Sequence, residues 1–131
     1  MLNPYTITMM QSPDPKDHVT YCIDEINEPL DAAQDCFRRS NENEVEFAHL
    51  RSMSIGDIVQ VHDGEDTRWF MCLPVGWMQV EDAFIKPWLG IPFLSRLTHP
   101  LTRMDDPLEA MMTRTKMVRG FIPFTNEVIH D

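Results

Sequence analysis

The sequence has few of the residues that build disulfide, metal or phosphate sites. It holds three cysteines, Cys22, Cys36 and Cys72, and no two of them have Cys-x-x-Cys spacing. An odd number without that spacing argues against a disulfide framework or a zinc site and favours a reducing, intracellular setting. The five glycines are spread over the whole chain, so the sequence has no glycine-rich phosphate loop. We therefore expect no cofactor.

Long apolar runs and a secretory leader are also missing. The longest apolar stretches are interrupted by Pro, Lys or Gly, which excludes a membrane-spanning helix. Residues 1–10, MLNPYTITMM, lack the basic segment and long apolar core of a signal peptide. These features predict a cytoplasmic protein that does not bind a membrane.

Basic residues are scarce: 11 Lys and Arg stand against 21 Asp and Glu, a formal net charge of −10. The imbalance lies in residues 1–66, with 14 acidic and 4 basic residues, whereas residues 67–131 have 7 of each. Nucleic-acid binding depends on Lys and Arg that displace counterions from phosphates, so direct binding is not expected. The acidic half either attracts a basic partner protein or only confers solubility.

The length of 131 residues and an apolar fraction of 43% fit a single domain over residues 1–131. The residue pattern predicts an α+β fold, a small antiparallel sheet of four to five strands with two packed helices. Strands are expected over residues 5–10, 18–26, 58–61, 68–73 and, on a sheet edge, 78–80. Helices are expected over residues 28–40 and 106–120, because both start with capping residues and a Pro in the first turn.

The run RSMSIGDIVQV, residues 51–61, contains two serines beside a glycine and an acid. As nucleophiles, Ser52 and Ser54 would need a positioned base and an oxyanion hole, and neither lies nearby in the sequence. Gly56 can adopt a positive φ without steric cost, and Asp57 can accept backbone N–H bonds. We therefore interpret the run as a turn that leads into a strand.

The same run, together with Val75-Gly76-Trp77, resembles a motif of small uncharacterised proteins of bacteriophages and other mobile elements. Those proteins carry an RSMSVGD-type turn, then a short hairpin and a VGW-type aromatic end; here Ile55 replaces the usual Val. The resemblance covers about residues 45–80. It implies a phage or plasmid origin, hence a bacterial host, and no particular activity.

Residues 83–101, AFIKPWLGIPFLSRLTHPL, are strongly apolar but contain Pro87, Gly90, Pro92 and Pro100. They match neither the helical nor the strand period well. Such a segment either wraps the core as an irregular arm or offers an exposed apolar surface to a partner. Trp69 and Trp77 are expected in the core, whereas the residues of this arm predicted to bind a protein are Trp88, as the interface anchor, Leu89, Ile91, Phe93 and Leu94.

No arrangement of residues indicates catalysis or metal binding. The five histidines show no HxH or HxxxH spacing. His62 and Asp63 are neighbours, but neighbouring strand residues point to opposite faces of a sheet. Cys72 lies in a predicted buried strand and is expected to pack there rather than react. We therefore predict no catalytic, cofactor-binding or metal-ligating residue, and a protein that is not an enzyme.

The favoured hypothesis is an accessory protein of a phage or mobile element that binds a protein partner stoichiometrically and inhibits a host defence or regulatory protein. The apolar arm would dock, while Asp31, Asp35, Glu42 and Glu44 would contribute to the interface and to the association rate. Two alternatives are a homo-oligomeric structural component of a phage assembly and a DNA mimic. The acids that would imitate phosphates in the DNA mimic are Asp24, Glu25, Glu28, Asp31, Asp35, Glu42, Glu44 and Glu46. An enzyme would instead require a buried pocket that gathers His and acidic residues from distant positions.

Overall fold

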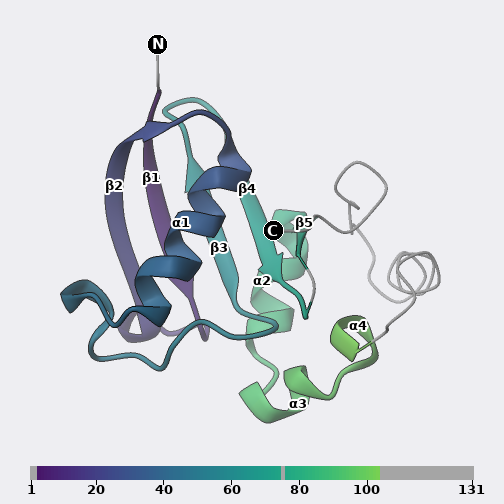
Figure 1. Ribbon diagram of the computed structural model, residues 1–131. Helices are drawn as coiled ribbons and strands as arrows, with labels where there is room; N and C mark the ends of the chain where they lie inside the picture. The colour runs from purple at the N-terminus through teal and green to yellow at the C-terminus, as the bar shows by residue number, and fades with distance from the viewer. Residues whose placement is uncertain (1–2, 75, 104–131) are drawn as a thin grey trace.

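The computed structural model describes residues 3–74 and 76–103; the predicted helix over 106–120 lies outside these residues. Five antiparallel strands form one sheet in the order β2-β1-β3-β4-β5 (Figure 1). Their bounds are β1 Asn3–Met10, β2 His18–Ile26, β3 Ile58–His62, β4 Thr67–Cys72 and β5 Trp77–Val80. The predicted α+β fold with a small antiparallel sheet is confirmed, and β5 is an edge strand as expected.

One face of the sheet packs against α1, Pro29–Asn41, which crosses it in Figure 1. Strand alternation sends Ile7, Tyr21 and Val61 to the same face, because Ile7 pairs with Tyr21 on one side and Val61 on the other. Ala32, Ala33 and Cys36 of α1 are buried against this face. Small side chains at the contact let the helix approach the sheet closely.

The opposite face carries a second apolar core at one end of the sheet. Here α2, Asp82–Leu89, covers Ile58, Met71 and Met78 with four buried side chains. Those four are Phe84, Ile85, Trp88 and Leu89. Their spacing places them on one side of a helix, so their burial stabilises both the helix and its attachment to the sheet.

For residues 83–101 the alternative of packing on the core is borne out for α2, but the irregular backbone that was expected is wrong. The segment forms α2, α3 (Phe93–Leu97) and α4 (Pro100–Arg103). Pro87 lies inside α2, where it cannot donate a backbone hydrogen bond. Packing of the apolar side of α2 outweighs that cost, since tertiary contacts override local propensity. Pro92 caps α3 and Pro100 starts α4, positions that proline tolerates.

The turn before β3 has the predicted form. Gly56 has a φ of 91°, and Ser54 N–H donates to Asp57 Oδ2 at 2.9 Å. A Cβ at Gly56 would lie 3.3 Å from Arg96 Cβ and 3.4 Å from Trp88 Cζ2. Only glycine meets both requirements, the left-handed backbone and the close approach of α2 and α3.

Replacing Gly56 by Ala should therefore destabilise the protein more than the same change at Gly64. Gly64 has a φ of 101° in the exposed β3–β4 turn, and nothing lies within 4 Å of the position that a methyl group would occupy there. We expect Gly64→Ala to lower the free energy of unfolding by about 1–3 kcal/mol through backbone strain alone. Gly56→Ala should cost about 1 kcal/mol or more beyond that, because its methyl crowds a packed site. Urea denaturation of both variants tests this; equal losses would contradict the packing argument.

Candidate functional site

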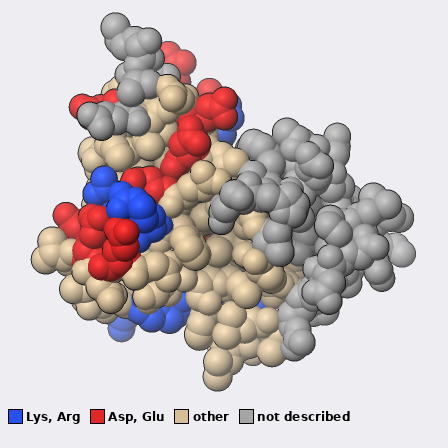
Figure 2. Space-filling model, in the orientation of Figure 1, with Lys and Arg blue, Asp and Glu red and all other residues tan. Residues whose placement is uncertain are grey.

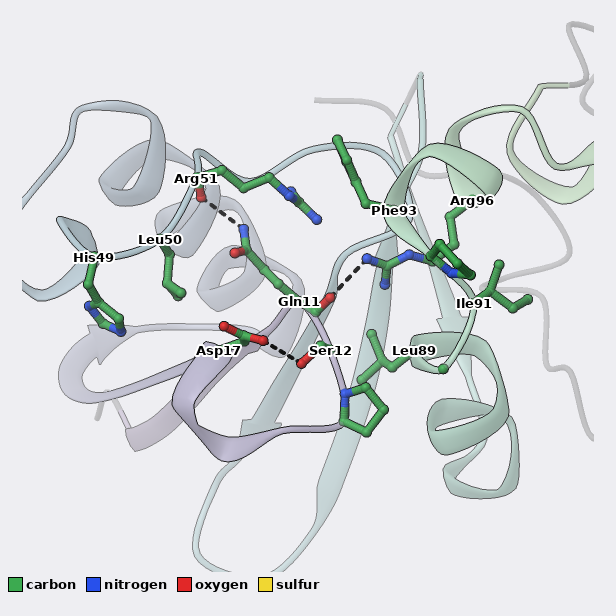
Figure 3. Close-up of a pocket in the computed structure, with 13 residues that line it drawn as sticks. Gln11, Ser12, Asp17, His49, Leu50, Arg51, Leu89, Ile91, Phe93 and Arg96 are labelled. Atoms are coloured by element: carbon green, nitrogen blue, oxygen red, sulfur yellow. Dashed lines mark hydrogen bonds between the residues drawn. The ribbon is translucent and has the colours of Figure 1, made fainter.

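A cavity of about 500 Å³ opens where three segments that are distant in the sequence meet. The segments are residues 11–17 after β1, residues 49–51 before β3, and residues 89–96 from the end of α2 into α3. Figure 3 shows Arg51, Phe93 and Arg96 on one side of it and Ser12 and Asp17 on another. A volume of this size suits a small-molecule ligand or an inserted side chain.

Asp57 is the ion-pairing centre beside this cavity. Its carboxylate is 0% exposed and accepts hydrogen bonds at 2.7 Å from both Arg51 Nη1 and Arg51 Nη2. The Ser54 N–H donates to it at 2.9 Å and Gln11 Nε2 at 3.3 Å. A bidentate Arg–carboxylate pair with further backbone and amide donors is a strong, geometrically defined interaction.

Arg96 is a second guanidinium near the same carboxylate. It is 1% exposed, and Nη2 donates to the Gln11 carbonyl at 2.9 Å but lies 3.8 Å from Asp57 Oδ1. Nε and Nη1 are buried and have no hydrogen-bond partner among the described residues. Burial lowers the pKa of Arg96; Asp57 opposes this shift, and Arg51 adds to it. Among the described residues, two guanidiniums thus share the one carboxylate of Asp57, and that of Arg51 is also partly exposed to solvent.

Arg51 also fixes the position of α3 at the cavity mouth. Its guanidinium carbon lies 3.6 Å from the centroid of the Phe93 ring, which is cation–π contact distance. Phe93 therefore covers the Arg51–Asp57 pair on the cavity side. The arrangement joins a cationic group to an apolar wall and can hold an acidic group with an apolar body.

The predicted protein-binding residues of the apolar arm separate into two groups. Trp88 and Leu89 are 2% and 4% exposed and belong to the second core, and Trp88 Nε1 donates to the Gly56 carbonyl at 2.8 Å. The prediction that Trp88 anchors an interface does not fit this burial, since its side chain stabilises the chain's own fold. Ile91 and Phe93 are half-buried in the cavity wall, whereas Leu94 is 72% exposed.

The predicted acidic residues bind basic residues of the same chain. Asp35 pairs with Arg39 at 2.7 Å and with Arg38 at 3.1 Å, and Arg38 also pairs with Glu42 at 2.7 Å. Glu44 lies 3.2 Å from Arg39 Nη1.

Asp31 caps α1, accepting from the Glu28 N–H at 3.3 Å. On the face shown in Figure 2, acidic side chains are interrupted by a cluster of Lys or Arg side chains. Three of the four predicted acids, Asp35, Glu42 and Glu44, are thus paired with Arg38 or Arg39, and Asp31 acts as a helix cap.

Sequence reasoning named Leu89, Ile91 and Phe93 of the cavity lining as binding residues, but it missed the polar and charged residues that line the cavity with them. Arg51 and Asp57 were visible as part of a turn motif, but their pairing needs the folded loop. A lone Arg96 in an otherwise apolar helix was the one available signal, because a charge on such a helix is buried only with a partner.

The remaining predictions concern the burial of two tryptophans and Cys72, metal sites and membrane-spanning helices. Trp77 and Cys72 are in the core beneath α1, as predicted, whereas Trp69 is only partly buried and packs against the second core on the opposite face. Within the described ranges, no three His, Cys, Asp or Glu side chains come together as metal ligands. No helix among residues 3–74 and 76–103 has the length and apolar character to cross a membrane.

Comparison with known proteins finds no match: no family model, no curated protein and no solved structure is similar to this chain.

Asp57→Asn should be the most damaging charge change in the described part of the chain. It removes the carboxylate charge while Arg51 and the buried Arg96 stay in place, so we expect a loss of about 3–5 kcal/mol in the free energy of unfolding. Asp24→Asn, at an exposed position of β2, is the matched control and should change it by less than about 0.5 kcal/mol. Urea denaturation measures both; similar small losses would show that Asp57 does not hold the loops together.

Acid should weaken α1 through Asp35. Burial alone would raise the pKa of Asp35, but hydrogen bonds from Tyr21, Arg39 and Arg38 outweigh it and hold the pKa below the ordinary 3.8. A depressed folded-state pKa stabilises the protein above the unfolded pKa, and this stabilisation is lost as the pH falls through the folded pKa. Stability measured by urea denaturation should therefore fall less for Asp35→Asn than for wild type between about pH 6 and pH 3. Parallel pH profiles of variant and wild type would refute this role.

Proposed function

We propose that the chain is a non-enzymatic accessory protein that binds a protein partner stoichiometrically through α3 and the mouth of the cavity. The observation that carries this proposal is Leu94, a large apolar side chain left 72% exposed beside a concave site. A single exposed apolar side chain is ordinary, but contiguous apolar surface beside a pocket is typical of binding sites. Ile91 and Phe93 extend the apolar surface into the cavity wall.

The partner we propose is a host defence or regulatory protein, which the chain would inhibit by occupying its surface. The likeness of residues 45–80 to phage and mobile-element proteins supports that origin. Acidic side chains outside the Arg38–Arg39 pairs would steer a basic partner and raise the association rate. Salt screens the electrostatic attraction and so lowers the association rate, whereas the apolar contacts of Leu94 are not screened by salt.

A DNA mimic and a homo-oligomeric assembly component are the two other candidates. A DNA mimic needs unpaired carboxylates in a row on one exposed surface. Asp35, Glu42 and Glu44 pair with Arg38 and Arg39, which reduces the net negative charge of this surface. The assembly component needs self-association, which would also use an exposed apolar residue such as Leu94.

Leu94→Glu tests the proposed surface. With tagged protein in nuclease-treated bacterial lysate, the variant should retain about tenfold less of the partner than wild type, because truncating or charging an interface anchor removes a large share of the binding energy. Val45→Glu is the matched control: Val45 is 82% exposed on the 3-10 turn Val45–Phe47, outside α3 and the cavity lining. That variant should bind like wild type.

The same capture at low and high salt, with light scattering on the purified protein, separates the three functions. A partner held at both salts and lost with Leu94→Glu supports the proposal. A DNA-binding protein released by high salt supports the mimic. A defined homo-oligomer that Leu94→Glu dissociates, with no partner captured, supports the assembly component.

A further inference from the structure

We infer that the cavity is a binding site for a small organic monocarboxylate, whose carboxylate pairs with Arg96 and whose apolar body lies against Leu89 and Ile91. This ligand is separate from the protein partner proposed above, and its binding does not depend on that partner.

The charge balance around Asp57 provides the first argument. The cluster contains one buried carboxylate, that of Asp57, one buried guanidinium, that of Arg96, and a second guanidinium, that of Arg51, whose side chain is 31% exposed. Arg96 Nε–H and both Nη1–H bonds have no acceptor among the described residues, although buried polar groups are nearly always paired. A buried charge without a counter-ion is costly, so an anion that reaches Arg96 gains favourable energy there.

Asp57 does not supply the missing acceptor in this conformation. Its Oδ2 accepts Arg51 Nη1, the Ser54 N–H and Gln11 Nε2, whereas Oδ1 accepts Arg51 Nη2 and stays 3.8 Å from Arg96 Nη2, beyond hydrogen-bond distance. Gln11 contributes only its carbonyl to Arg96. Among the described residues none supplies this acceptor, and Arg96 lines the cavity, so we place the acceptor on a ligand in the cavity.

The walls of the cavity determine what else the ligand carries. Leu50, Leu89, Ile91, Pro92 and Phe93 give it apolar surface, and the volume of about 500 Å³ accommodates a chain of several carbons. Inorganic anions would gain nothing from these walls. The cavity thus suits a carboxylate attached to an apolar group.

Asp17 limits the ligand to one acidic group. It lines the cavity and accepts the Ser12 hydroxyl at 2.7 Å, so a carboxylate is held on the wall that Figure 3 shows away from Arg96. A dicarboxylate would bring its second charge toward Asp17 and be repelled. Since Nε and Nη1 are covered in this conformation, Arg96 must rotate toward the cavity to donate to the ligand.

A titration of the wild-type protein tests the inference, followed by amide chemical shifts in two-dimensional NMR at constant ionic strength. The probes are hexanoate, its neutral analogue hexanamide, the dicarboxylate adipate and inorganic phosphate. Hexanoate should shift the amides of residues 89–96 and 11–17 in a saturable way. The other three should bind about tenfold more weakly or not at all, the factor expected when a charge-assisted hydrogen bond is lost.

Arg96→Met removes the guanidinium and should abolish the preference for hexanoate over hexanamide. Arg68→Met, at an exposed position of β4, is the control and should keep it. If Arg96→Met does not fold, the affinities of the wild-type protein for hexanoate and for hexanamide test the inference. Equal binding of those two probes, stronger binding of phosphate or adipate, or no saturable shift with hexanoate would each overturn the inference.

Discussion

The Arg51–Asp57 ion pair attaches the loop after α1 to the adjoining ends of β1 and β3, which already pair with each other at Met10 and Ile58. Asp57 stands between the turn at Gly56 and β3, Arg51 lies in the loop after α1, and Gln11 directly follows β1. Arg96 adds α3 through the Gln11 carbonyl. Because every donor converges on one buried carboxylate, the loops cannot shift separately without leaving a charge unpaired.

Gly56 connects this polar centre to the second apolar core, the one beneath α2. Its carbonyl accepts the Trp88 indole N–H, and its bare Cα lets α2 and α3 approach. The position of α2 therefore depends on both Trp88 burial and the turn beside Asp57. A change in the turn affects the second core, and a change in the core displaces Arg96. The cavity lies beside both the turn at Asp57 and the end of α2.

Local signals in the sequence were enough to predict the sheet and α1. Alternation over residues 18–26, the Asp63–Asp66 turn and the Gly56-Asp57 pair each act within a few residues, and the structure confirms them. The irregular backbone expected for residues 83–101 was wrong, although part of the segment does pack on the core. The prolines hid the helical spacing of Phe84, Ile85 and Trp88, which become buried against the sheet. The cavity could not be predicted, because Gln11, Arg51 and Arg96 are separated by up to 85 positions and meet only through the folded sheet.

The burial of Arg96 is the observation behind the proposed ligand. A buried ion pair is often no more stable than apolar residues of the same volume, so stability alone does not account for a buried Arg96 on α3. An unmatched guanidinium lowers the stability of the isolated protein and raises that of any state in which an anion pairs with it. Ligand binding would then be linked to folding of the same loops, since Arg96, Gln11 and Asp57 share one network. The exposed Leu94 lies two residues before Arg96 on α3, so one short helix carries both the exposed apolar side chain and the buried guanidinium at the cavity.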